Sequence, residues 1–215
     1  MPRFADLLGL AGAGVVIVAV TVAAGRKLGL RRSRLGLLAG LGTIVALVPA
    51  GSLPLCASLR GVAGDLSLTT LVLLLIGLRR ALQGGSESVD CPSAAALRWL
   101  VAAGGLFLYP LTLGLGAWDP YRLGYGDPWF LAALLVVAFL SLLLDLGLVT
   151  FAVALAVLAW AGGAGDSRNL WDYLLDFPVF LWAFSSLLWN GGRALVGIHR
   201  RAGEEPLRIR AEASR

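Results

Sequence analysis

Acidic and aromatic side chains gather in a few short polar segments of an otherwise apolar chain. The densest is 118–129, Trp-Asp-Pro-Tyr-Arg-Leu-Gly-Tyr-Gly-Asp-Pro-Trp, and a second covers 166–176. Carboxylates that occur together with tyrosine, arginine and asparagine can bind a sugar, a cation or a loop of a partner protein. The candidate binding residues, which we expect to form one patch, are Asp65, Asp119, Tyr121, Arg122, Asp127, Arg168, Asn169, Asp172 and Asp176.

The same segments also have a purely structural interpretation. Asp127 before Pro128 has the pattern of a helix N-cap with proline at the first helical position, and Asp119-Pro120 is typical of a turn. Loops carry function but also need caps and turns, so this interpretation stays open beside the binding site. Four aromatic residues further fit a belt at the level of lipid headgroups: Trp118, Tyr121, Trp129 and Trp171.

Two segments, 124–127 and 163–166, match the pattern G-x-G-D. The pattern resembles the motif of intramembrane aspartyl proteases such as the prepilin peptidases. In that family two aspartates share a proton and activate water, because like charges at close range cannot both ionise. The resemblance implies that Asp127 pairs with another aspartate, and Asp65 is the closest in character. In those enzymes the pair faces the cytoplasm, whereas the arginine distribution described below puts both residues outside.

Other catalytic and metal chemistries lack the residues that they need. The chain has one histidine, His199, which lies in a basic tail, so we expect neither a zinc site nor a Ser-His-Asp triad. The patterns HExxH, GxSxG and GxxxxGK[ST] do not occur. Cys56 and Cys91 form no metal or disulfide framework. We therefore expect no metal and no cofactor, assign no catalytic residue, and leave open whether the protein is an enzyme.

The composition favours a membrane protein. Hydrophobic residues make up 58% of the 215 residues and charged residues only 14%, compared with roughly 45–50% and about 25% in soluble domains. A soluble protein needs charge to cover its surface, whereas a protein in lipid does not. The net charge of +5 would suggest nucleic-acid binding in a soluble chain, but here it is better explained by arginines in cytoplasmic loops, and we expect no nucleic-acid partner.

Six apolar runs are candidates for membrane spans, and one of them is long enough for two. The run 129–161 is interrupted only by Asp145, and a single helix of about 33 residues would rise about 50 Å, beyond a hydrocarbon core of about 30 Å. We therefore predict a turn near 144–147 that divides it. The remaining spans are predicted at 7–24, 35–48, 66–78 and 97–115, with a last one that starts between Leu170 and Pro178 and runs toward Gly192 or Ile198.

Local signals mark where these spans begin and bend. Asp65 lies just ahead of the third span and is predicted as its N-cap. The pair Tyr109-Pro110 predicts a kink in the fourth span. If the segment before the last span is helical, Arg168, Asp172 and Asp176 follow at i, i+4 positions and share one face.

The positively charged residues predict the orientation. With seven spans, 14 of the 18 Lys and Arg residues fall on one side, which the positive-inside rule makes cytoplasmic. We therefore expect an all-α fold, a polytopic integral membrane helical bundle of about seven transmembrane helices, with the N-terminus outside and the C-terminus cytoplasmic. The transmembrane domain is predicted at 1–198 and a basic cytoplasmic tail at 199–215.

Small size and the lack of a soluble domain or a complete catalytic set favour a non-catalytic role. The leading hypothesis is a subunit or assembly and accessory factor of an envelope system, surrounded by the lipid bilayer and working with other membrane proteins. Two alternatives remain: a small transporter, and an outer-face membrane enzyme that acts on a lipid-linked substrate through its aspartates. The bias toward Ala, Gly, Leu and Arg suggests a GC-rich bacterial genome and hence the bacterial cytoplasmic (inner) membrane.

Overall fold

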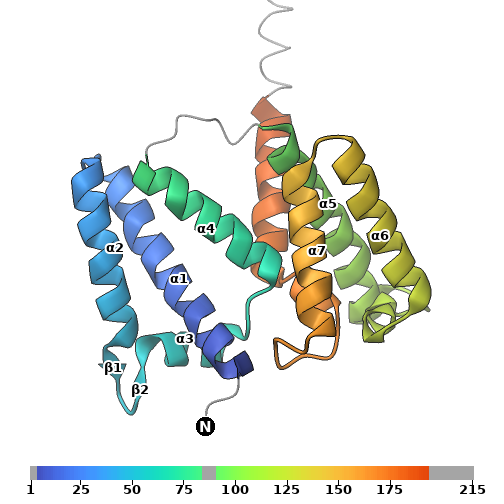
Figure 1. The fold of residues 1–215 in the computed structure, drawn as a ribbon, viewed down its shortest axis with the longest axis horizontal. Coiled ribbons are helices and arrows are strands. Elements are labelled where there is room, and N and C mark those ends of the chain that lie inside the picture. The colour runs from blue at the N-terminus through green and yellow to red at the C-terminus, as the bar shows by residue number, and fades with distance from the viewer. Residues whose placement is uncertain (1–3, 84–90, 194–215) are drawn as a thin grey trace, which may run out of the picture.

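Two groups of helices stand side by side in the computed structural model, which describes residues 4–83 and 91–193 (Figure 1). The fold is all-α apart from one short hairpin, as predicted. The predicted tail at 199–215 lies outside the described residues. The first group consists of α1 (Phe4–Lys27), α2 (Arg32–Leu47), the antiparallel strands β1 (Pro49–Ala50) and β2 (Leu53–Pro54), and α3 (Leu55–Ala63).

The second group follows the helix α4 (Leu68–Gln83), which slants between the two groups (Figure 1). α4 packs against α1 and α2 on one side and against α7 and α8 on the other. The second group contains α5 (Pro92–Pro110), the π-helix η1 (Leu111–Leu115), the 3-10 helix η2 (Pro120–Tyr125), α6 (Pro128–Leu143), α7 (Gly147–Ala161), α8 (Trp171–Leu174) and a final helix at 177–193.

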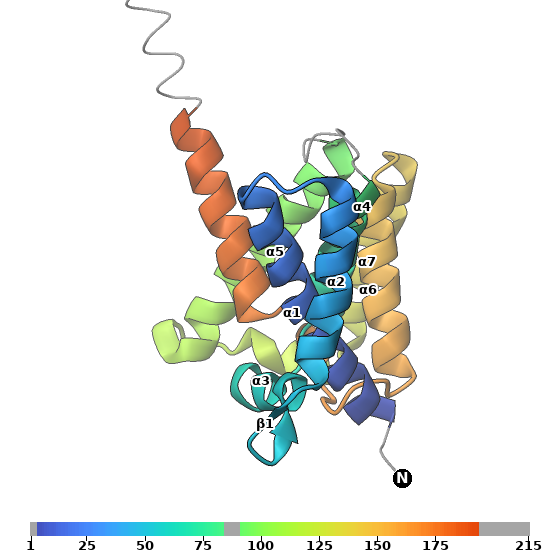
Figure 2. The ribbon, with the colours of Figure 1, turned by 90° about the vertical axis from the view of Figure 1, so that its left-hand side faces the viewer.

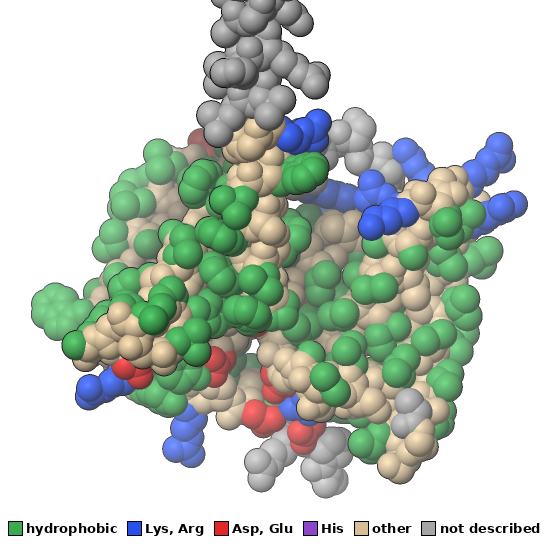
Figure 3. Space-filling model, turned by 180° about the vertical axis from the view of Figure 1, so that it is seen from behind, with side chains coloured by type: hydrophobic (Ala, Val, Ile, Leu, Met, Phe, Trp, Pro, Cys, Tyr) green, Lys and Arg blue, Asp and Glu red, His purple; other side chains and the backbone are tan. Residues whose placement is uncertain are grey.

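The long helices alternate in direction, so the connections gather at two ends of the molecule (Figures 1 and 2). One end holds the start of α1, the β1–β2 hairpin, α3, η2, and the segment 162–176; we call it the acidic end. The other holds the end of α1, the start of α2, the ends of α4 and of the final helix, and the turn between α6 and α7; we call it the basic end. Most Lys and Arg side chains in this view lie at the basic end, whereas Asp side chains lie mainly at the acidic end together with a few Lys and Arg side chains; apolar side chains cover the surface between the two ends (Figure 3).

Only two helices in the described ranges are long and apolar enough to cross a membrane by length and composition. They are Phe4–Lys27 and the continuous Pro92–Leu115, each of 24 residues. A core helix of a soluble protein or a signal sequence would meet the same criterion. The other predicted spans are shorter: α6 and α7 are apolar but have 16 and 15 residues, or about 24 Å of rise. The apolar runs from which seven spans were predicted include turn residues, which lengthen the run but not the helix.

The division of the longest apolar run is confirmed. α6 ends at Leu143 and α7 begins at Gly147, so the turn falls at 144–146. Asp145 has a φ of 56°, in the left-handed region that an aspartate tolerates better than most residues. The Leu146 N–H donates to the Ser141 carbonyl at 2.8 Å and closes the end of α6.

At the predicted kink, Tyr109-Pro110, the helix changes from α to π, and the non-helical backbone lies further on, at Gly114 with a φ of 88°. Proline has no N–H to donate, so an α-helix loses one bond where it occurs. The chain passes from α5 to the π-helix η1 immediately after Pro110. The Thr112 hydroxyl donates to the carbonyls of Leu108 and Tyr109, both at 3.0 Å, and so satisfies acceptors next to the change of helix type.

The main apolar core lies in the second group, where α5, α7, α8 and the final helix meet. Small residues let these helices approach closely: Ala156 and Ala183 are fully buried, and a Cβ at Gly105 would overlap the Phe180 ring. A second, small cluster in the first group contains Ala13, Ala46 and Cys56. Each group of helices therefore has an apolar cluster of its own, and the two groups meet at the acidic end.

Candidate functional site

A cavity of about 560 Å³ opens at the acidic end, where the two groups of helices meet. α1 and the start of α4 form one wall, and the segment 165–167, α8 and the start of the final helix form the other. Of the predicted binding residues, the structure brings Asp65, Asp172 and Asp176 together here. Asp166 is the fourth carboxylate of the lining. We call this space the acidic cavity.

Arg60 ties three segments together beside the acidic cavity. Its Nε is 2.5 Å from Asp65 Oδ1, its Nη1 is 3.2 Å from Asp6 Oδ1, and its Nη2 is 2.9 Å from Asp166 Oδ2. The hydrogen bond that Arg60 donates to Asp65 raises the pKa of Arg60 above its ordinary range, against the opposing effect of burial. A guanidinium, which is always charged and has several donors, suits this role because each nitrogen can serve a different carboxylate.

Asp172, on α8, accepts hydrogen bonds from two hydroxyl groups. The Tyr121 hydroxyl lies 3.0 and 2.9 Å from its two oxygens, and Ser167 Oγ lies 2.5 Å from Oδ2. Burial, together with the hydrogen bond to Asp172, raises the pKa of Tyr121. The phenol is therefore held as a neutral donor, and its bond to Asp172 joins η2 to α8.

Asp176 joins the final helix to α4. Its Oδ1 accepts from the Val179 N–H at 2.7 Å and caps the final helix. Its Oδ2 accepts from the Ser67 N–H at 2.9 Å and from Thr70 Oγ1 at 2.5 Å. The first turn of α4 is capped by Ser67, whose Oγ accepts from the Thr70 N–H at 3.2 Å. The N-cap role predicted for Asp65 is therefore wrong, because Asp65 is paired with Arg60 instead.

Asn169 is fully buried and has a structural role outside the acidic cavity. Its Nδ2 donates to the Tyr121 carbonyl at 2.9 Å, and its Oδ1 accepts from the Trp171 N–H at 3.0 Å. Trp171 is itself only 7% exposed, and its indole N–H donates to the Pro120 carbonyl at 3.0 Å. The predicted aromatic belt is therefore wrong for Trp171, which belongs to the core, whereas Trp129 is exposed.

The cap interpretation of the 118–129 segment is confirmed. Asp119 Oδ1 accepts from the Tyr121 N–H, and Asp127 Oδ1 accepts from the N–H groups of the first turn of α6. Asp127 does not line the acidic cavity and Asp65 does. The pairing of Asp127 with Asp65, implied by the resemblance to aspartyl proteases, is therefore not present: Asp127 serves α6, and Asp65 serves Arg60.

The two arginines of the predicted patch do not join the aspartates. Arg122 and Arg168 are exposed, and neither lines the acidic cavity. The prediction that Arg168, Asp172 and Asp176 share one helical face is wrong, because α8 has only four residues and Leu175 is extended. Arg168 instead lies in the preceding loop, where its carbonyl accepts from the Trp160 indole at 2.8 Å.

Several polar groups of the site were not predicted. The Tyr173 hydroxyl accepts from the Gly165 N–H and donates to the Ser167 carbonyl, both at 3.0 Å. Tyr109, from α5, also lines the acidic cavity. Tyr109 occurs within an apolar run and gives no polar signal in the sequence. Tyr173 and Ser167 lie in the polar segment 166–176, and that signal could have been used, whereas Thr70 lies inside the apolar run of the third predicted span.

The arrangement as a whole connects helices. Within the described ranges, no group of three or more His, Cys, Asp and Glu side chains is placed to hold a metal ion. The carboxylates of the acidic cavity accept bonds from Arg60, from hydroxyls and from backbone N–H groups. Chemically the site can hold a ligand that offers donors or positive charge, but its existing bonds join α1, α3, α4, α8 and the final helix.

Comparisons of the chain with known protein families, with curated proteins and with solved structures find no match.

Proposed function

We propose that the chain is a bacterial cytoplasmic-membrane protein with seven crossings that serves as a non-catalytic subunit or assembly factor of an envelope system. One observation supports the non-catalytic role. The carboxylates at the acidic end cap helices, bind Arg60 or, in Asp172, accept from the hydroxyls of Tyr121 and Ser167, so the residues best suited to acid–base chemistry are used to hold the bundle together. A catalytic aspartate pair would instead need two carboxylates that face each other and a shared proton.

The exposed apolar surface supports the membrane location. α6 buries only Ser141, while Leu135 is 66% exposed and Phe139 is 60% exposed. A water-soluble monomer rarely exposes an apolar patch of this extent. Lipid tails or the helices of a partner would cover it. The gathering of Lys and Arg at one end then makes that end cytoplasmic.

The short helices are compatible with crossing a bilayer. A helix shorter than the hydrocarbon core is accommodated by local thinning of the bilayer and by flanking residues that reach the interface. α4 has Arg79 and Arg80 near its end, and their long aliphatic stems can span the remaining distance. Seven crossings therefore remain the arrangement that agrees with both the alternating helices and the charge distribution.

The proposal is tested by the mass of the intact particle. A tagged copy is extracted from its native membrane with a mild detergent, and the mass of the purified particle is determined. We expect a companion protein in stoichiometric amount, since a subunit or assembly factor acts through its partners. A particle that contains only this chain would contradict the proposed role.

The acidic cavity favours a second candidate, an outer-face enzyme or transporter. Its volume of about 560 Å³ lies within the range of roughly 300–1,000 Å³ that is common for ligand pockets. The substitution Asp172→Asn keeps an acceptor for Tyr121 and Ser167 but removes the charge. Loss of cellular function with an intact particle would favour the second candidate over the first.

A further inference from the structure

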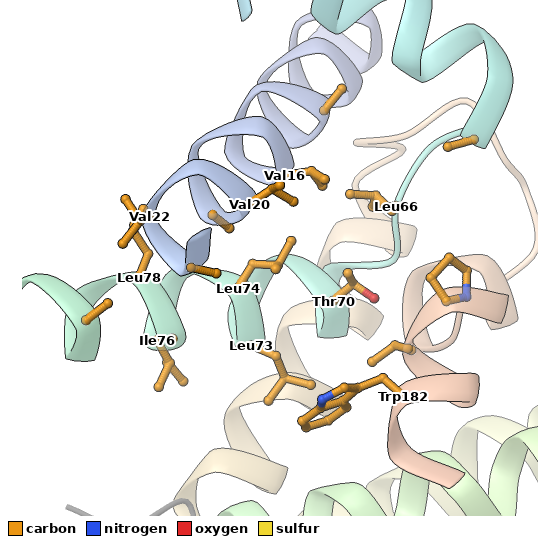
Figure 4. Close-up of a pocket in the computed structure, with 18 of the residues that line it drawn as sticks. Val16, Val20, Val22, Leu66, Thr70, Leu73, Leu74, Ile76, Leu78 and Trp182 are labelled. Carbon is orange, nitrogen blue, oxygen red and sulfur yellow. The ribbon is translucent and has the colours of Figure 1, made fainter. Parts of the chain in front are cut away.

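A second and larger cavity lies on the face between α1, α4 and the final helix. It has a volume of about 670 Å³ and is a groove rather than a closed chamber. Figure 3 shows the corresponding recess between the final helix and the first group of helices. Figure 4 shows its walls: Val16 and Val20 extend from α1, Leu73 and Leu74 from α4, and Trp182 from the final helix. We call it the lateral groove.

Charge in the lateral groove is concentrated at its ends. Arg26 at the end of α1, Arg80 at the end of α4 and Arg98 near the start of α5 line it toward the basic end. Arg98 is only 8% exposed. At the opposite end the groove is lined by Arg60, which is already bound by three aspartates. The groove is thus an apolar channel with a group of three arginines at one end.

We propose that the lateral groove binds one acyl chain of an anionic phospholipid, with the phosphate among Arg26, Arg80 and Arg98. The inference rests on the proposed membrane location and adds a defined lipid site to it. Guanidinium groups match phosphate oxygens in geometry and charge. The basic end is proposed to face the cytoplasm, whose leaflet carries anionic lipids that attract clustered arginine.

Charge complementarity favours a lipid over a partner helix as the occupant. An acyl chain with a phosphate is apolar along its length and anionic at one end, which is the pattern of the groove lining. A partner helix would have to bring acidic residues to the arginines and an apolar face to the remainder. If a partner helix occupied the groove, phospholipid binding would be weak and unselective. The lipid titrations described next would then contradict the proposal.

The first experiment measures lipid selectivity. The full-length protein is delipidated in detergent and titrated with phosphatidylglycerol or with phosphatidylcholine, and bound lipids are counted by native mass spectrometry. We expect one phosphatidylglycerol to bind in preference to phosphatidylcholine. Glycerol phosphate, which has the head but no chain, should not displace it. Equal binding of both lipids, or displacement by glycerol phosphate, would overturn the proposal.

A pair of double variants tests the arginines. Arg26→Gln with Arg80→Gln removes two groove-lining charges, and Lys27→Gln with Arg79→Gln removes the neighbouring charges on the same helices, which do not line the groove. We expect the first pair to weaken phosphatidylglycerol binding at least about tenfold, the loss expected for charge-assisted hydrogen bonds. The control pair should bind as the wild type does. Equal losses in both pairs would show a general effect of charge and no defined site.

A matched pair of glycine variants tests the apolar part. Gly77 of α4 lines the groove, and a Cβ there would meet nothing within 4 Å. Gly36 of α2 is equally open but does not line the groove. Gly77→Leu should fill the channel and abolish binding of the retained lipid, whereas Gly36→Leu should leave it unchanged. Unchanged binding in a folded Gly77→Leu protein would contradict the acyl-chain site.

Alkaline washing of membranes separates failure of this inference from failure of the proposed function. A protein that stays in the washed membrane but shows no preference for phosphatidylglycerol would overturn the lipid site alone. A protein that is released without detergent would overturn the membrane location and the lipid site together.

Discussion

At the scale of single residues, Arg60 shows how the acidic end is held together. It lies in the last turn of α3, and its partners Asp6 and Asp166 lie in the first turn of α1 and in the loop after α7. One side chain thus connects segments that are more than a hundred residues apart in sequence. A single arginine among small and apolar residues gives no sign of such a role before the fold brings Asp6 and Asp166 close to it.

Replacement of Arg60 should therefore destabilise the contact between the two groups of helices. Arg60→Gln removes three ion pairs whose carboxylates are between 37% and 49% exposed. Because exposed pairs contribute less than 1 kcal/mol each, we expect a loss of roughly 1–2 kcal/mol. The measurement is thermal unfolding in detergent, followed by circular dichroism. Arg122→Gln, at an exposed position, serves as the control, and an equal loss in the control would contradict the account.

The bond between Tyr121 and Asp172 should make stability sensitive to alkaline pH. The pKa of Tyr121 is raised in the folded state by burial first and by Asp172 second, above the ordinary value of about 10. The neutral phenol therefore stabilises the fold fully below pH about 10, and this stabilisation is lost as pH rises toward the folded-state pKa.

Tyr121→Phe tests this dependence. It should cost about 1 kcal/mol near neutral pH, the typical contribution of one hydrogen bond. Above pH 10 the free energy of unfolding should fall more steeply in the wild type than in the variant. Parallel curves for the two proteins across this range would show that Tyr121 does not have the proposed role.

At the scale of elements, the contact of η2 with the loop before α8 depends on a glycine. The Leu170 N–H donates to the Gly124 carbonyl at 2.8 Å, and a Cβ at Gly124 would overlap Asn169 Oδ1. Gly124→Ala must therefore displace a buried amide that has partners on both sides.

We expect Gly124→Ala to destabilise the protein by about 1–3 kcal/mol, the usual cost of overpacking. Gly147→Ala is the matched control, because a Cβ at the first residue of α7 meets nothing within 4 Å. Chemical denaturation of both variants in detergent measures the difference. Similar stabilities for the two variants would mean that the overlap is relieved without cost.

Element ends were predictable from the sequence where a short local pattern decides them. Asp127-Pro128 predicted a cap, and the length of the 129–161 run predicted the turn at Asp145, because capping and helix rise are local properties. The shared face of Arg168, Asp172 and Asp176 was predicted on the condition that the segment is helical, and it fails because the chain leaves the helix after Leu174. Asp65 was predicted as a cap from its place before the third span, but it binds Arg60, five residues earlier in the sequence.

The candidate site was predictable in part. The aspartates at 65, 172 and 176 were chosen for their type and location, and all three line the acidic cavity. Tyr109 was missed because its hydroxyl group lies in an otherwise apolar run, whereas Tyr173 lies in the polar segment 166–176 and could have been included. Arg122 was included because it belongs to a polar segment, although its side chain is exposed and lies outside the cavity.

At the scale of the whole molecule, apolar faces and segregated charges have one common explanation. A bilayer would cover the exposed apolar side chains, and it would separate the acidic end from the basic end. The lateral groove and the acidic cavity would then open to the lipid and to the outer aqueous side respectively. The separation of the two ends and the side to which each cavity opens both depend on the orientation of the helices in the membrane.

That orientation is tested most directly by thiol labelling from one side. In a background with Cys56→Ala and Cys91→Ala, single cysteines are placed at the acidic end by Ser52→Cys and at the basic end by Ser33→Cys, both at exposed positions. Intact cells are treated with a thiol reagent that cannot cross membranes. We predict that the cysteine at position 52 reacts in intact cells and that the cysteine at position 33 reacts only after permeabilisation. Reaction of both positions in intact cells, or of neither until permeabilisation, would contradict a bundle that places its two ends on opposite sides of the membrane.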